Sequence, residues 1–184
     1  MTLDGFCEHT ALNADETIHD HYTEVLRNSS AIIYGRITYQ LMEDYWPSIV
    51  KNPTGNKPVD EFGILIDNIS KVVFSRTLKN DHPAITGWKN ARVAKKSVAE
   101  EVLELKQQPG KDVLVGSPSL IVATMNLGLV DEFQINVQPA IVAKGLSLLK
   151  NINDRINLKL LKTKTFGCGA VTLYYEPTKN QALT

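Results

Sequence analysis

The sequence has few cysteines, no long apolar run and no excess of charge of either sign. Its two cysteines, Cys7 and Cys168, lie far apart in 184 residues. We expect free thiols in a reducing compartment, with one disulfide as the alternative. The apolar runs are a handful of residues long, well short of the roughly 20 needed to span a membrane. Met1-Thr2-Leu3-Asp4 shows no signal-peptide pattern. These absences predict a cytoplasmic protein with no membrane partner.

The charge balance and the absence of several motifs argue against further classes of protein. Lys and Arg number 20 and Asp and Glu number 20, so no overall basic field indicates a nucleic-acid partner. The sequence contains neither G-x-G-x-x-G nor a Walker lysine loop, and no serine stands in a nucleophile elbow. His19 and His21 are two apart on an expected helix, so they do not share a face. We expect solvated histidines and no metal site.

Apolar spacing predicts helices alternating with strands, followed by longer strands in the last third. The expected helices cover 15–28, 37–45, 59–67, 98 to about 108, and 117–127. Ile37, Leu41 and Tyr45 would share one face of the second. The expected strands are 31–35, 71–75, 91–94, 112–115, 132–142, 156–165 and 170–176, with loops at 48–57 and around Pro83–Gly87. This order predicts one α/β domain over 1–184: a mixed, mostly parallel sheet flanked by helices, with an antiparallel C-terminal edge.

Two expected strands end at a glycine and lead into a helix. The first is followed by Gly35, Arg36 and Thr38, the second by Gly116 and Ser117. Free amides and the helix dipole at such junctions favour phosphate, and two of them suit a dinucleotide. Gly35 would let a phosphate approach, Arg36 would clamp it, and Ser117 would also cap its helix. A plain turn with a solvated arginine is the alternative at the first junction.

A third polar junction follows the expected strand 71–75, which lies between the other two junctions in the sequence. Ser75, Arg76 and Thr77 offer two hydroxyls and a guanidinium at the carboxyl end of a strand, where ligands of open α/β sheets bind. These groups suit a ribose 2′-phosphate, and a polar turn is the alternative. Near the N-terminus, Asp4 precedes a glycine turn, where it would cap the turn or face a substrate.

In this order and spacing, the motifs resemble the dihydrofolate reductase-like family that includes the C-terminal reductase domain of the riboflavin-biosynthesis deaminase/reductase. The resemblance covers nearly the whole chain. It includes Thr2 to Phe6, Gly35 to Tyr39, Val73 to Leu78, Trp88-Lys89-Asn90, Val115-Gly116-Ser117, 128–132 and 139–145.

The resemblance implies NADPH as cofactor and a homodimer. Gly35, Arg36 and Thr38 would hold the pyrophosphate and adenosine phosphate, and Ser75, Arg76 and Thr77 the 2′-phosphate end. Gly116 and Ser117 would lie beneath the pyrophosphate and nicotinamide. The catalytic residue stays unassigned, with Asp4, Glu8 and Asp15 as the nearby acidic candidates.

The chain departs from the family in two places. Relatives have an apolar strand before Leu3-Asp4-Gly5, so we expect either a shortened start or a sheet without that strand. Relatives often have two glycines near Ala143-Lys144-Gly145, so we expect a stiffer loop here.

The resulting hypothesis is an NADPH-dependent reductase resembling 5-amino-6-(5-phosphoribosylamino)uracil reductase, which transfers hydride to a heterocyclic or carbonyl-like small molecule. The alternatives are dihydrofolate reductase activity, a dinucleotide-binding module without catalysis, and a structural dimer with no ligand.

Overall fold

A computed structural model describes residues 1–7 and 14–178 of the chain. The acidic candidate Glu8 and the residues after 178 lie outside the described part. No helix within it is long and apolar enough to cross a membrane. Cys7 and Cys168 are both half-buried free thiols, which confirms the expectation for these residues.

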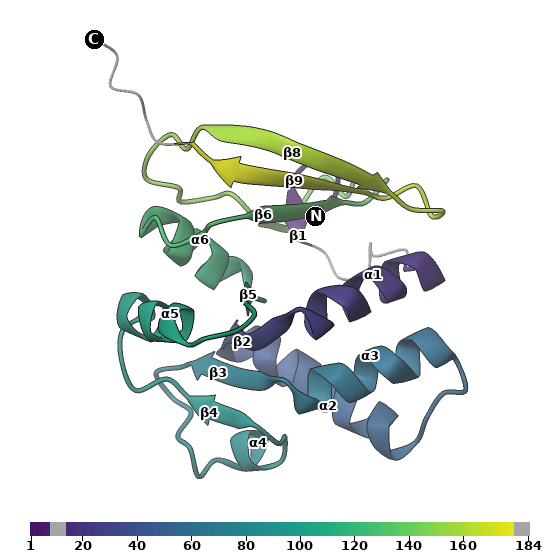
Figure 1. The fold of residues 1–184 in the computed structure, drawn as a ribbon, viewed down its shortest axis with the longest axis vertical. Helices are drawn as coiled ribbons and strands as arrows, with labels where there is room; N and C mark the ends of the chain where they lie inside the picture. The colour runs from purple at the N-terminus through teal and green to yellow at the C-terminus, as the bar shows by residue number, and fades with distance from the viewer. Residues whose placement is uncertain (8–13, 179–184) are drawn as a thin grey trace.

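The larger half of the molecule is built on a four-stranded parallel sheet in the order β4-β3-β2-β5, which we call the parallel sheet (Figure 1). Its strands are β2 (Ser29–Gly35), β3 (Ser70–Phe74), β4 (Ala91–Val93) and β5 (Asp112–Val115). β2 pairs in parallel with both β3 and β5. Parallel strands buried on both faces are apolar on both, as Ala31 to Tyr34 are.

Helices cover both faces of the parallel sheet. The helices are α1 (Glu16–Arg27), α2 (Arg36–Lys51), α3 (Lys57–Asn68), α4 (Pro83–Thr86), α5 (Val98–Gln107) and α6 (Pro118–Asn126). On one face Ile32 and Tyr34 of β2 belong to a core with α1, α2 and α3. On the other face Ala31 and Ile33 belong to a core with Val102 of α5 and other residues of α5 and α6. The alternation of side chains along one strand therefore supplies both cores.

A three-stranded antiparallel sheet in the order β6-β9-β8, the C-terminal sheet, forms the other half (Figure 1). Its strands are β6 (Phe133–Val137), β8 (Leu158–Thr165) and β9 (Val171–Pro177), and a small pair, β1 (Phe6–Cys7) and β7 (Leu146–Ser147), lies beside it. The expected fold class is confirmed. In detail, the C-terminal strands form a separate sheet, because β5 and β6 are not paired with each other.

The second helix is longer than predicted. The sequence predicted a helix to about residue 45 and a loop from 48, whereas α2 continues to Lys51 with Pro47 inside it. Proline costs one backbone hydrogen bond, but Trp46 and Ile49 on either side are buried in the core and hold the last turns in place. A short helix, α4, also occupies part of the expected loop around Pro83.

The apolar face expected on α2 is present, but it does not meet the core. Ile37, Leu41 and Tyr45 do share a face, but they are 75%, 50% and 50% exposed. The face that packs inward carries Tyr39 and Trp46 instead. Helical spacing identifies residues that share a face without showing which face meets the sheet.

A buried lysine fixes the end of α3 to the strands. The Lys71 side chain is fully buried, and its Nζ donates to the carbonyl oxygens of Asp67, Ile69 and Lys89 at 3.0, 2.9 and 3.2 Å. It also lies 4.3 Å from the centre of the Trp88 ring. Burial lowers the pKa of Lys71 to about 8.

A buried carboxylate fixes β4 to α5 in a similar way. Glu101 accepts two hydrogen bonds from the Arg92 guanidinium, at 3.1 and 2.7 Å, and a third from the Lys95 amide at 2.9 Å. The hydrogen bonds from Arg92 are the main reason why the pKa of Glu101 falls from 4.5 to about 2.

Helix α1 contacts both halves of the molecule. Leu26 lies in the core of the parallel sheet, whereas Ile18 packs on Phe166 and Ala170 of the C-terminal half. The carboxylate of Asp15, which caps this helix, also accepts a hydrogen bond from the Cys168 amide at 2.8 Å.

We predict that Glu101→Gln lowers the free energy of unfolding at neutral pH by about 1–3 kcal/mol, because it weakens charged hydrogen bonds of a buried group. Glu101 has a lowered pKa in the folded state, so its contribution is complete above 4.5 and is lost as the pH falls toward about 2. Urea unfolding should therefore show the difference between variant and wild type shrinking below about pH 4.5.

Glu104→Gln is the matched control, since the Lys96–Glu104 pair is half-exposed on both sides. It should change stability by less than about 0.5 kcal/mol. A Glu101→Gln difference that stays constant as the pH is lowered would contradict the assignment.

Candidate functional site

The carboxyl ends of β2, β3 and β5 lie side by side, and we call this region the carboxyl edge. Gly35 at the end of β2 is paired with Phe74 at the end of β3. On the other side, the Gly35 amide donates to Ser117 Oγ at 2.8 Å. The structure therefore brings together the three polar junctions that the sequence singled out.

Two helices of the carboxyl edge begin without a side-chain cap. Gly35 is the N-cap of α2 and Ser117 the N-cap of α6, and neither makes a side-chain capping bond. The expected N-cap position of Ser117 and the first helical position of Pro118 are confirmed. The expected cap itself is absent, because the Ser117 hydroxyl is used to accept from Gly35.

Arginine and hydroxyl side chains follow both β2 and β3 at the carboxyl edge. Arg36 is exposed and donates to Gln40 Oε1 at 2.9 Å, while Thr38 is half-buried in the first turn of α2. Ser75 Oγ accepts from the amides of Thr77 and Leu78 at 3.1 and 2.9 Å, which shapes the turn after β3. Arg76 and Thr77 are exposed at that turn.

Ser117 and Gly116 have packing roles at this edge. Ser117 is 1% exposed, so its side chain positions Gly35 and does not reach the surface. A Cβ on Gly116 would lie 2.4 Å from Tyr34 Cε1, which no side chain tolerates. Glycine at 116 is thus required by the Tyr34 ring, a reason that the strand pattern did not reveal. A Cβ on Gly35 would lie 3.3 Å from Ser119 Oγ, which also makes that position tight.

The two described acidic candidates accept hydrogen bonds from the backbone. Asp4 Oδ2 accepts from the amides of Val142 and Ala143 at 3.1 and 2.8 Å, and Oδ1 accepts from the Thr2 hydroxyl at 2.6 Å. These hydrogen bonds lower the pKa of Asp4, and the one from the Thr2 hydroxyl has the largest effect. Asp15 caps α1, and its pKa is lowered chiefly by the Thr17 hydroxyl. Both carboxylates are therefore ionised at neutral pH.

The loop that Asp4 holds contains an unusual backbone conformation. Ala143 has φ 63°, in the left-handed region that favours glycine, and Gly145 has φ 146°. The alanine expected to stiffen this loop therefore occupies a strained conformation.

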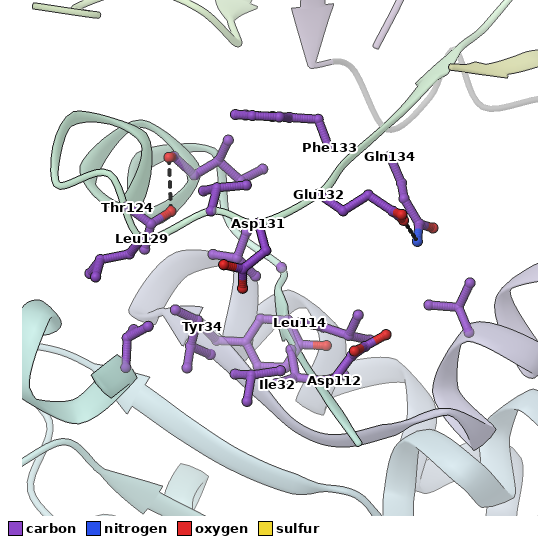
Figure 2. A pocket seen from close by; sticks show the side chains of 18 of the residues that line it. Ile32, Tyr34, Asp112, Leu114, Thr124, Leu129, Asp131, Glu132, Phe133 and Gln134 are labelled. Atoms are coloured by element: carbon purple, nitrogen blue, oxygen red, sulfur yellow. Dashed lines mark hydrogen bonds between the residues drawn. The ribbon is translucent and has the colours of Figure 1, made fainter. Parts of the chain in front are cut away.

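A cavity of about 740 Å³ separates the two sheets, and sequence reasoning did not identify it. Figure 2 shows Phe133 and Gln134 on one side of it and Ile32, Tyr34 and Leu114 on the other. Thr38 and Gly116 also line it, so it reaches the carboxyl edge. Apolar spacing marks these side chains as interior but does not show that they face a space.

His21 is buried, which corrects the expectation of a solvated histidine. Its Nε2 lies 3.2 Å from the Tyr174 hydroxyl and its Nδ1 lies 3.4 Å from Lys164 Nζ. Burial first, then the nearby Lys164 and Lys162, lower the pKa of His21 to about 4. Within residues 1–7 and 14–178, no group of His, Cys, Asp or Glu side chains could hold a metal ion.

This architecture is that of the dihydrofolate reductase-like α/β domains of riboflavin-pathway reductases. Residues 1–172 match the RibD C-terminal domain, and the chain belongs to that family. It is 37% identical to the uncharacterized protein YyaP of Bacillus subtilis (strain 168) over 180 residues, or 95% of this chain and 90% of that protein.

Solved structures of low sequence identity share the fold. A protein of Shewanella sp. PV-4, assigned provisionally to riboflavin biosynthesis, is 14% identical with a TM-score of 0.71, covering 97% of this chain and 96% of that one. The bifunctional diaminohydroxyphosphoribosylaminopyrimidine deaminase/5-amino-6-(5-phosphoribosylamino)uracil reductase of Thermotoga maritima is 17% identical with a TM-score of 0.65. The match covers 96% of this chain but only 54% of that protein.

We predict that Gly116→Ala lowers the free energy of unfolding by about 1–3 kcal/mol, because the new methyl group overlaps the Tyr34 ring. In a Tyr34→Ala background the same substitution should cost clearly less, because the overlapping atoms are gone. Urea unfolding of the four proteins of this double-mutant cycle measures the coupling. Equal costs in both backgrounds would show that Tyr34 is not the reason for glycine at 116.

Proposed function

We propose that this protein is an NADPH-dependent reductase that transfers hydride to a heterocyclic or carbonyl-like small molecule. Its membership in the RibD C-terminal domain family supports a reductase, and the Thermotoga maritima relative is named as a 5-amino-6-(5-phosphoribosylamino)uracil reductase. That reaction is the first candidate for the activity. The proposal includes a homodimer in the cytoplasm.

The observation that carries the proposal is the convergence of three polar junctions at the carboxyl edge. The amino ends of α2 and α6 have no side-chain cap, so their amides and dipoles are directed to the place where β2 and β5 end. Arg36 and Arg76 add exposed positive charge on the β2 and β3 sides. This set of donors fits a ligand with several phosphates.

Different residues of the carboxyl edge would bind different parts of the cofactor. The backbone at Gly35 and the side chains of Arg36 and Thr38 would hold the pyrophosphate and adenosine phosphate. Arg76, with Thr77 and the turn that Ser75 shapes, would bind the ribose 2′-phosphate. Gly116 would lie beneath the pyrophosphate and nicotinamide, with Ser117 holding Gly35 in position.

When bound, NADPH supplies the hydride, and the protein contributes position and electrostatics. The polar edge would fix the phosphates, so that the nicotinamide end has a defined place relative to the substrate. A dinucleotide-binding module without catalysis is the second candidate, and one observation favours it. Asp4 and Asp15 are both held ionised, so neither carries a proton for a substrate at neutral pH.

A thermal-shift series with NADPH, NADH, dihydrofolate and the phosphoribosylamino-pyrimidine should show its largest cofactor shift with NADPH. A ligand at about 100 times its Kd stabilises the folded state by about 2.7 kcal/mol. NADPH oxidation with each substrate then separates the two candidate functions. A binding module without catalysis would show the thermal shift with NADPH but would not oxidise it. The absence of any shift with NADPH would overturn both.

Arg76→Ala should weaken NADPH binding by about tenfold or more while leaving NADH binding unchanged, because the lost charge-assisted bonds go to the 2′-phosphate. Calorimetric titration with both cofactors provides the measurement. Arg155→Ala is the matched control, as Arg155 is exposed in the C-terminal half, where it donates to Asn157 Oδ1. Equal loss for both cofactors would place Arg76 elsewhere on the ligand.

A further inference from the structure

The face of the C-terminal sheet that meets α1 carries polar side chains in two cross-strand rows, which we call the polar face. The strand register places Gln134, Tyr174 and Lys162 in one row and Asn136, Thr172 and Lys164 in the next. Tyr174 and Lys164 contact His21 of α1, so this face is directed at the helix. A sheet face that packs on a helix is ordinarily apolar, and the polar face therefore indicates a polar partner.

A second cavity, of about 450 Å³, lies between the polar face and α1. Lys162, Lys164 and Tyr174 line it from the sheet, and His21 lines it from the helix. This volume falls in the range of roughly 300–1,000 Å³ that is usual for small-molecule sites.

This second cavity lies at the opposite end of the parallel sheet from the carboxyl edge. Asn28, directly before β2, and Asp112, the first residue of β5, both line it. Gly35 of the carboxyl edge is at the other end of β2, which is seven residues long and thus spans about 20 Å. A ligand in the second cavity would therefore be distinct from one at the carboxyl edge.

A buried histidine and tyrosine leave one hydrogen-bond donor without an acceptor. His21 and Tyr174 are 8% and 4% exposed. Because a lysine ammonium group only donates, Nδ1 of the neutral His21 ring accepts from Lys164, and Nε2 carries the proton that is donated to the Tyr174 oxygen. No atom of the described residues accepts the hydroxyl hydrogen of Tyr174. That hydrogen is free to be donated to a ligand.

The two lysines of the polar face have no acidic partner among the described residues. Lys162 Nζ lies 4.5 Å from the centre of the Tyr174 ring, and Lys164 Nζ lies 3.4 Å from His21 Nδ1. By contrast Lys159, on the same strand, donates to Glu176 at 2.8 Å. Burial first, and then the positive charges of Lys164 and Lys162, lower the pKa of His21. The histidine therefore experiences a positive potential that no neighbour neutralises.

Two carboxylates also line the second cavity, but they leave it with net positive charge. Glu24 accepts hydrogen bonds from the Arg27 guanidinium at 3.1 Å and from the Asn28 side-chain amide at 2.9 Å, so its charge is already matched. Asp112 adds one negative charge on the β5 side. The two lysines of β8 exceed it by one charge.

We propose that the second cavity is a binding site for the phosphate group of a small molecule, either as the free anion or as a monoester. Lys162 and Lys164 supply positive charge, and the Tyr174 hydroxyl supplies a third donor, which suits the three free oxygens of a monoester dianion. The anion joins the C-terminal sheet to α1, because His21 forms the opposite wall. This site is independent of the proposed reductase activity.

Calorimetric titration of the 184-residue protein with sodium phosphate and with glycerol 3-phosphate, at constant ionic strength, tests the proposal. The double variant Lys162→Gln/Lys164→Gln should bind at least about tenfold more weakly than wild type. Lys159→Gln is the matched control on the same strand and should bind as wild type does. Tighter binding of the ester would identify an organic phosphate as the ligand, and tighter binding of inorganic phosphate would identify the free anion.

Tyr174→Phe provides a second variant, since it keeps the buried ring and removes only the hydroxyl. It should weaken binding by about three- to tenfold, the loss of one hydrogen bond.

Three outcomes would overturn the proposal. One is the absence of saturable binding to either phosphate compound, and another is equal affinity in wild type and the lysine double variant. The third concerns the place of binding, measured by amide chemical shifts during the titration. Changes centred on Gly35 and Arg36, with none at His21 and Lys164, would assign the anion to the carboxyl edge.

Discussion

The parallel pairing of β2 with both of its neighbours is the constraint on which the candidate site depends. Because β3 and β5 run in the same direction as β2, their carboxyl ends meet at one edge, with Gly35 between the other two junctions. The Gly35–Ser117 hydrogen bond then fixes the distance between the ends of β2 and β5. Glycine at 116 lets the Tyr34 ring pack beneath the same edge. Polar residues that are far apart in the sequence are thus brought together at the carboxyl edge.

Much of this edge could be predicted, because it depends on local patterns and one topological rule. A short apolar strand, a glycine and a helix start can each be recognised in the sequence, and parallel strands place their carboxyl ends together. The individual roles could not be predicted in the same way. Whether Ser117 contacts a ligand or supports Gly35 depends on burial, which the sequence pattern does not contain.

The features that the sequence pattern did not reveal have a common physical origin, since each depends on what lies opposite a residue. Ile37 and Leu41 have helical spacing, yet the helix presents its other face to the sheet. Pro47 is a helix breaker by propensity, but the buried Trp46 and Ile49 outweigh the lost bond. His21 reads as a surface residue until Phe166 and Tyr174 of the C-terminal half cover it. The cavity could not be foreseen, because apolar residues give the same pattern whether or not a partner fills the space beside them.

Helix α1 has a mechanical consequence for the molecule. One end of this helix is fixed to the C-terminal sheet through Ile18 and the Asp15 carboxylate, and the other end lies in the core of the parallel sheet through Leu26. Because α1 is attached at both ends, a separation of the two sheets would require α1 to tilt or to lose one of these attachments. The width of the cavity is therefore coupled to the tilt of α1.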